Sequence, residues 1–170
     1  TGALRLSQVN RGVDASLSIA GVSFRHLAML AQIKSNDEDV WNSLNKSQHI
    51  DGRPNEALIG RLSRMRNWIN SVHFPEDARI KIQEKMDLNT REKLTEKQIQ
   101  FLLILSDKLR SCKWSEKEIG EKIRESTKET EVSPREGYVA LYMLILGVDF
   151  GPRIASIILE LGQDITMEIF

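Results

Sequence analysis

The chain has 170 residues, of which 41% are hydrophobic and 6% aromatic, and its 24 basic residues balance 24 acidic ones. The apolar content is enough for a buried core and argues against wholesale disorder. Charge neutrality argues against nucleic-acid binding over the whole surface, but a local basic face remains possible because phosphates respond to the local field. The single cysteine, Cys112, excludes an internal disulfide and favours a reducing cytoplasm. No apolar stretch is long enough to span a bilayer.

The first half of the chain is predicted to form a helical subdomain over residues 21–94, after a linker or lead-in at 1–20. Ser23 is the expected N-cap of a first helix, and Asp37 the expected cap of a second. Apolar residues at three- and four-residue steps predict a third helix, and proline followed by acids predicts the start of a fourth. The expected helices run from 23 to 34, from 37 over a short stretch, from 55 to 72 and from 75 to 86.

The second half, residues 95–170, is predicted to form another helical subdomain after a polar hinge at 87–94. Thr95 with Gln98 fits a capping box, and Ser115 and Ser133 begin two further helices in the same way. The helix at 134–146 is apolar nearly all round, so we expect it to be central, with Gly147 as its stop. Gly151-Pro152 should start a last long helix that ends at Gly162. No segment alternates at period two, and we predict an all-α bundle of about seven to nine helices.

The residues that could support catalysis do not form a recognisable site. His26, His49, His73 and Cys112 lack metal-ligand spacing, so we predict no metal. His26 fits a boundary residue beside the core, and Cys112 fits a half-buried helix position. The phosphate-binding glycine motifs are absent, so no cofactor is predicted here. Carboxylates lie at expected helix starts and on polar faces, and we predict no catalytic residue.

A basic set with an aromatic residue stands out instead. Positions 61, 64 and 68 fall on one side of a helix, and the set consists of Arg61, Arg64, Arg66 and Trp68. Guanidinium groups suit phosphates, and an indole can stack on an unpaired base. Residues 53–93 carry an excess of three positive charges. The alternative is that Trp68 belongs to the core and the arginines form an ordinary solvated face.

The segment 146–153 is the second feature. A helix start at Gly151-Pro152 with Arg153 beside it could attract a phosphate, or the glycine could serve a tight turn between helices. Its residue order resembles the closing motif of class I lysyl-tRNA synthetases, which runs through an aromatic, A-L-Y, L-L-G and G-P-R. The matching residues are Tyr138-Val139-Ala140-Leu141-Tyr142, Leu146-Gly147, Gly151-Pro152-Arg153 and Leu159-Glu160-Leu161-Gly162. Upstream matches are Val22-Ser23-Phe24-Arg25-His26-Leu27, Ala31-Gln32, Arg64, Asn67-Trp68-Ile69 and Pro75-Glu76.

The resemblance covers about residues 21–170 and implies an α-helical cage that holds the anticodon arm of tRNA-Lys. The parent enzyme would be a cytoplasmic lysine–tRNA ligase that activates lysine with ATP. The H-I-G-H-like and K-M-S-K-S-like signatures are absent. We therefore expect a C-terminal portion without its catalytic domain, inactive alone, with ATP, lysine and any metal confined to the missing part. We also expect a monomer without membrane contact.

The resemblance favours RNA contacts by Arg61, Arg64 and Arg66. Trp68 stays open between packing and stacking, and Arg153 between RNA binding and bracing the last two helices. Two other interpretations remain open at this point. The chain could be the equivalent region of a glutamyl-tRNA synthetase, or a helical protein-interaction module with no RNA role.

Overall fold

The computed structural model describes residues 21–86 and 88–170, and within these ranges it contains helices and no strand. The all-α prediction is therefore confirmed. The lead-in predicted for residues 1–20 lies outside the described residues. The chain divides into two compact units, one ending at Pro75 and the other beginning at Glu76. The sequence predicts a boundary further along the chain, between residues 94 and 95. The two subdomains over 21–94 and 95–170 stay a prediction. We describe each unit separately.

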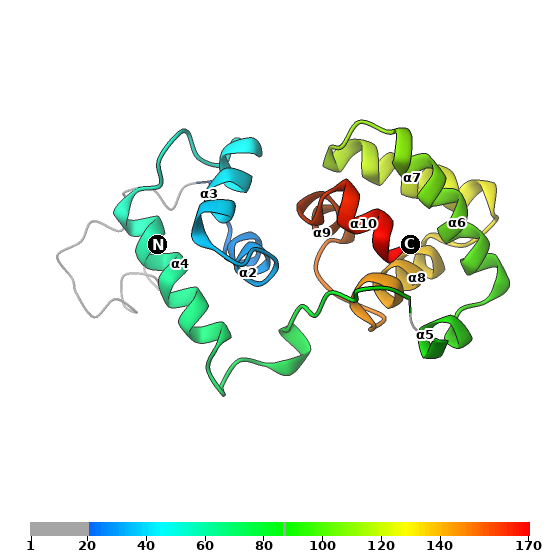
Figure 1. Ribbon diagram of the computed structural model, residues 1–170, viewed down its shortest axis with the longest axis horizontal. Coiled ribbons are helices and arrows are strands. Elements are labelled where there is room, and N and C mark those ends of the chain that lie inside the picture. Colours follow the sequence, from blue (N-terminus) through cyan, green and yellow to red (C-terminus); the bar gives the residue numbers. More distant parts are fainter. Residues whose placement is uncertain (1–20, 87) are drawn as a thin grey trace. The chain divides into compact units, whose positions relative to one another are not determined.

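The first unit is built from α2 (Phe24–Ile33), α3 (Asp37–Lys46) and α4 (Glu56–Ile69), shown from blue to green in Figure 1. Each helix begins at a polar side chain that accepts a hydrogen bond from a backbone N–H three residues later. The caps are Ser23, Asn36 and Asn55. The expected cap Asp37 is thus wrong by one residue, because the Asn36 side chain takes that role. Buried leucines and valine join the three helices: Leu27, Leu30, Val40, Leu44, Leu58 and Leu62.

The segment that follows α4 differs from its prediction. Instead of a helix over 75–86, only one 3₁₀ turn forms at Glu76–Ala78, and α5 (Leu88–Lys93) occupies the expected hinge. Gln83 explains part of the difference, because its backbone N–H donates to the carbonyl of Ile145 at 2.8 Å instead of to an intrahelical acceptor. This contact fixes the extended segment against the end of another helix.

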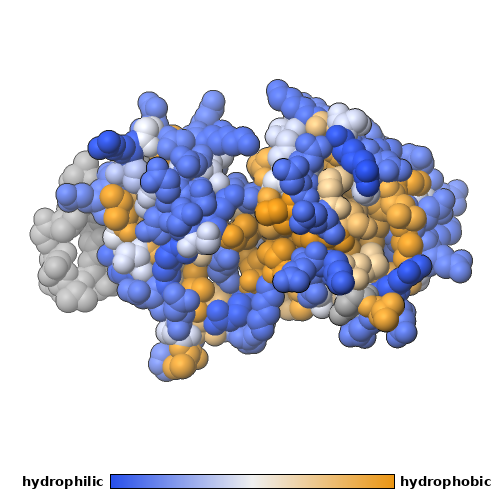
Figure 2. Space-filling model, viewed as in Figure 1, coloured by the Kyte–Doolittle hydropathy of each residue, from blue (hydrophilic) through white to orange (hydrophobic). Residues whose placement is uncertain are grey.

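The second unit contains α6 (Glu96–Ser111), α7 (Glu116–Glu129), α8 (Pro134–Leu146), α9 (Ile154–Leu161) and α10 (Gln163–Ile169). Capping boxes begin α6 and α8, as the sequence predicts. The helix α6 packs on α7 and α8, and α7 also packs on α9. Buried residues are found on all sides of α8, which confirms its central place: Gly137, Ala140, Leu141, Met143, Leu144, Ile145 and Leu146. On the face in Figure 2, hydrophobic residues gather over this unit.

The described helices include none that is long and apolar enough to cross a membrane.

Gly147 ends α8 in the left-handed conformation, with φ at 70°. A Cβ added there would clash with Nε2 of Gln83. We expect Gly147→Ala to lower the free energy of unfolding by about 1–2 kcal/mol, because alanine disfavours this backbone conformation and its methyl group would displace Gln83. Urea unfolding measures the loss. In a Gln83→Ala background the steric part should disappear, so an unchanged loss there would contradict the role of Gln83.

Candidate nucleic-acid interface

One side of α4 presents a groove that unites most of the predicted basic set. Arg61, Arg64 and Trp68 line it together with Met65 of the same helix and Phe24 of α2. The groove has a volume of about 320 Å³. Positions 61, 64, 65 and 68 share one side of α4 because the helix repeats every ~3.6 residues. The predicted grouping of 61, 64 and 68 is therefore present in the structure.

Trp68 packs against two aromatic rings and is also partly exposed at the surface. Its ring centroid lies 4.7 Å from that of Phe74 in an edge-on contact and 5.9 Å from that of Phe24 in a tilted one. Phe74 is buried, whereas 37% of Trp68 and 51% of Phe24 remain exposed. The indole is thus anchored on one side by the core, and together with Phe24 it forms an aromatic wall of the groove.

Arg61 is fixed by the backbone of the segment before α2. Its Nη1 donates to the carbonyl oxygen of Val22 at 2.9 Å. Partial burial lowers the pKa of Arg61, and the positive charge of Arg64 lowers this pKa further. A guanidinium has five N–H donors, so one bond to Val22 leaves others for a ligand.

Arg64 is exposed on the same side of α4. Its Nη1 lies 3.3 Å from the position that a Cβ on Gly60 would take, so the side chain folds back along the helix. Among residues 21–86 and 88–170, none forms a hydrogen bond or an ion pair with Arg64. Its charge is therefore available to an external anion.

Arg66 lies away from this groove and connects three elements of the first unit. Its Nε donates to Oδ1 of Asp37 at 2.7 Å, at the start of α3. Its Nη1 donates to the carbonyl of Ala31 at 3.1 Å, and both Nη atoms donate to the carbonyl of Lys34 at 3.3 Å. The guanidinium thus satisfies carbonyl groups at the C-terminal end of α2, where helices leave acceptors unpaired. Its RNA contact remains a prediction, beside this structural role.

Arg153 precedes α9 in the second unit and pairs with an acid of α7. Its Nη1 lies 3.0 Å from Oε1 of Glu116, and the hydroxyl of Ser156 donates to the same oxygen at 3.1 Å. Because 80% of the Arg153 side chain is exposed, the ion pair contributes little to stability. The contact braces α7 against the start of α9, and contact of Arg153 with RNA stays a prediction.

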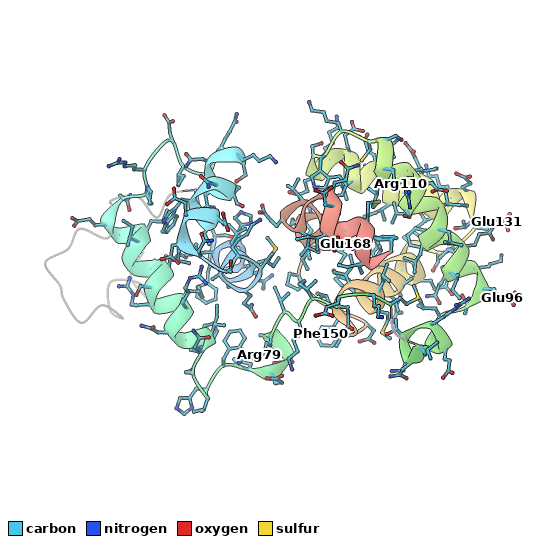
Figure 3. All side chains as sticks on the ribbon, in the orientation of Figure 1. Arg79, Glu96, Arg110, Glu131, Phe150 and Glu168 are labelled. Carbon is cyan, nitrogen blue, oxygen red and sulfur yellow. The ribbon has the colours of Figure 1, made fainter. Side chains whose placement is uncertain are left out.

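The loop before Arg153 is held closely against α8. The hydroxyl of Tyr142 donates to the carbonyl of Pro152 at 2.8 Å. A Cβ on Gly151 would lie 2.8 Å from Cδ1 of Leu146, so only glycine fits this approach without a shift. Phe150, labelled in Figure 3, stands exposed on the same loop. The glycine and tyrosine of the closing motif thus serve packing.

The described part of the chain contains no group of three or more His, Cys, Asp and Glu residues that could hold a metal ion. His26 stacks on His49 with ring centroids 4.7 Å apart, which fits a packing contact beside the core. Burial raises the pKa of the Cys112 thiol, and the charge of Glu118 raises it further. A raised pKa disfavours the reactive thiolate.

Phe24 and Met65 are the groove residues outside the predicted basic set, and Phe74 supports Trp68 from the core side. Phe24 directly follows the N-cap Ser23, and half of it is exposed. Its place in the groove depends on the packing of α2 against α4, for which the sequence around residue 24 gives no local signal.

The family model described as "Anticodon binding domain" matches residues 28–168, which include parts of both units. Lysine–tRNA ligases of several organisms are also similar to the chain. That of Methanocaldococcus jannaschii is 27% identical over 154 residues, which cover 84% of this chain and 28% of the relative. That of Treponema pallidum is 29% identical over 159 residues, with 92% and 29% covered. That of Archaeoglobus fulgidus is 28% identical over 166 residues, with 94% and 32% covered.

The chain therefore spans less than a third of the length of these curated relatives. The comparisons confirm the resemblance to class I lysyl-tRNA synthetases that the closing motif predicts. The family model covers far more than half of the chain. The chain belongs to the anticodon binding domain family.

Proposed function

We propose that this chain binds the anticodon arm of tRNA-Lys as the C-terminal portion of a lysine–tRNA ligase. The whole enzyme would attach lysine to tRNA with ATP in the cytoplasm, and this portion would act as a monomer without catalysing the reaction. The match of residues 28–168 to the anticodon binding domain carries the proposal. The name shared by the relatives supports lysine as the amino acid.

The groove on α4 supports the same proposal on physical grounds. An anticodon loop offers phosphates and unpaired bases, and proteins recognise such loops through cationic side chains and aromatic stacking. Arg64 supplies an available charge, Arg61 further N–H donors, and Trp68 an exposed ring. Arg66 and Arg153 would contribute charge near the RNA while they keep their contacts within the protein.

The test is filter binding of the chain to tRNA-Lys between 50 and 200 mM salt. With about three phosphate contacts, affinity should fall roughly 10–100-fold over this range, because each contact releases counterions. Exchange of the anticodon bases in the same tRNA should weaken binding, whereas exchange of the acceptor-stem sequence should not. Equal affinity for tRNA-Lys and for the anticodon-exchanged tRNA would overturn the proposed recognition.

A further inference from the structure

The groove on α4 is small, and it combines an aromatic wall with two positive charges. Phe24 and Trp68 form the wall, and Arg61 and Arg64 lie along the same groove. Its volume of about 320 Å³ is at the lower end of the ~300–1,000 Å³ typical of small-ligand sites. A helix of a partner protein, with a diameter of about 10–12 Å, would need a longer and wider surface. The size therefore favours a single flat group with an anionic attachment.

The two guanidinium groups indicate that the ligand carries a negative charge. Arg61 and Arg64 lie close enough for the charge of Arg64 to lower the pKa of Arg61. In the described ranges, neither arginine has a carboxylate partner. Two like charges beside a partly desolvated groove repel each other, and an anion between them removes that repulsion. A phosphate group has the required charge and accepts hydrogen bonds from both.

The aromatic wall indicates the rest of the ligand. Phe24 and Trp68 contact each other with centroids 5.9 Å apart, which leaves no room for a base between them. A base can therefore stack only on the wall, where half of Phe24 is exposed. Phe74 holds Trp68 from the core side, so the wall is in place before a ligand binds.

We propose that this groove is a pocket for one unpaired nucleotide, whose base stacks on Phe24 and Trp68 while its phosphate lies against Arg64. Arg61 is a positioning residue, because its bond to the carbonyl of Val22 ties the segment that leads into Phe24 to α4. The inference rests on the proposed function, which names an RNA loop as the ligand, and it adds the position where one loop nucleotide is held.

The experiment uses the full chain and an anticodon stem-loop RNA that carries 2-aminopurine at one unpaired loop position at a time. Stacking on an aromatic side chain quenches the fluorescence of this base, so we expect protein binding to lower the fluorescence further at one loop position. Phe24→Leu keeps an apolar side chain but removes the ring, and should weaken stem-loop binding about tenfold and abolish that quenching. Phe24→Tyr should restore both. Arg64→Gln should weaken binding of the same RNA about three- to tenfold and lower the slope of log affinity against log salt by about one.

Two variants outside the groove serve as controls. Ile59 lies on the opposite side of α4 and is 46% exposed, so Ile59→Ala removes apolar surface without touching the wall. Arg53→Gln removes an exposed charge of the same unit before α4. Both should bind the stem-loop like the original chain, and circular dichroism should show all variants folded.

The outcomes separate the two proposals. If the original chain binds no tRNA and no stem-loop, the proposed function and the pocket fail together. If it binds tRNA-Lys with anticodon preference, but Phe24→Leu and Phe24→Tyr bind equally well and no loop position is quenched, only the pocket is overturned. The pocket would also be overturned if Phe24→Leu weakened binding of a blunt RNA duplex as much as it weakens binding of the stem-loop, since a duplex offers no unpaired base.

Discussion

Replacing Phe101 with alanine is expected to lower the free energy of unfolding of the second unit by about 3–5 kcal/mol. Phe101 lies on α6 and is fully buried. Its ring reaches within 3.4 Å of the position that a Cβ on Gly137 of α8 would take, which is an ordinary packing distance, so the ring lies in the contact between α6 and α8. Removing the ring leaves a cavity that α6 and α8 cannot close without moving together.

Hydrogen exchange followed by mass spectrometry can measure this loss by segment, which matters in a chain with two compact units. Protection should fall in α6, α7 and α8, while α2 to α4 serve as an internal reference. Leu103→Ala on the same helix is the matched control, because Leu103 is 60% exposed and its loss should change stability by less than about 0.5 kcal/mol. Similar losses for both variants would contradict the packing of α6 against α8.

Helix starts were the part of the fold most accessible to sequence reasoning. Ser23, Thr95, Ser115 and Ser133 were all predicted as caps, and each accepts the expected hydrogen bond from the third residue of its helix. A cap acts over one turn, so the residues that decide it are neighbours in sequence. Gly147 belongs to the same class, because its left-handed backbone is a local property.

The segment 75–93 shows where local reasoning fails. Proline and two acids at 75–77 favour a helix start, and one 3₁₀ turn does form there. The continuation is decided by a distant partner, since Gln83 gives its N–H to Ile145 of α8. Such a long-range bond has no signature in the sequence around residue 83. Leu88–Lys93 then forms a helix in a stretch whose polarity had indicated a hinge.

The candidate site was predictable in its chemistry and only partly in its geometry. Helical spacing places 61, 64 and 68 on one side of α4, and the structure brings them to one groove. Spacing left Arg66 off that side but did not reveal its contacts, because its partners Asp37 and Lys34 come from other elements. It also did not find Phe24, because the pairing of α2 with α4 is tertiary information.

Arg66 and Arg64 should therefore behave in opposite ways when each is replaced by alanine. Arg66→Ala removes the fork that satisfies the carbonyls of Ala31 and Lys34 and pairs with Asp37. With 24% of the Arg66 side chain exposed, we expect a loss of about 2–3 kcal/mol in the free energy of unfolding of the first unit. Arg64→Ala removes an exposed charge that no described residue pairs with, and should change stability by less than about 0.5 kcal/mol.

Binding to tRNA-Lys should give the reverse order. At a temperature where both variants are folded, Arg64→Ala should weaken binding and reduce its salt dependence. Arg66→Ala should weaken binding less, by no more than about twofold, because contacts within the protein hold the Arg66 guanidinium and it adds only charge near the RNA. Arg66→Lys should recover only part of the lost stability, because a single ammonium group cannot form the fork. Urea unfolding and filter binding on the same preparations measure both quantities. A stable Arg66→Ala variant with weak tRNA binding would make direct RNA contact the main role of Arg66, because its bonds within the first unit would then contribute little to folding.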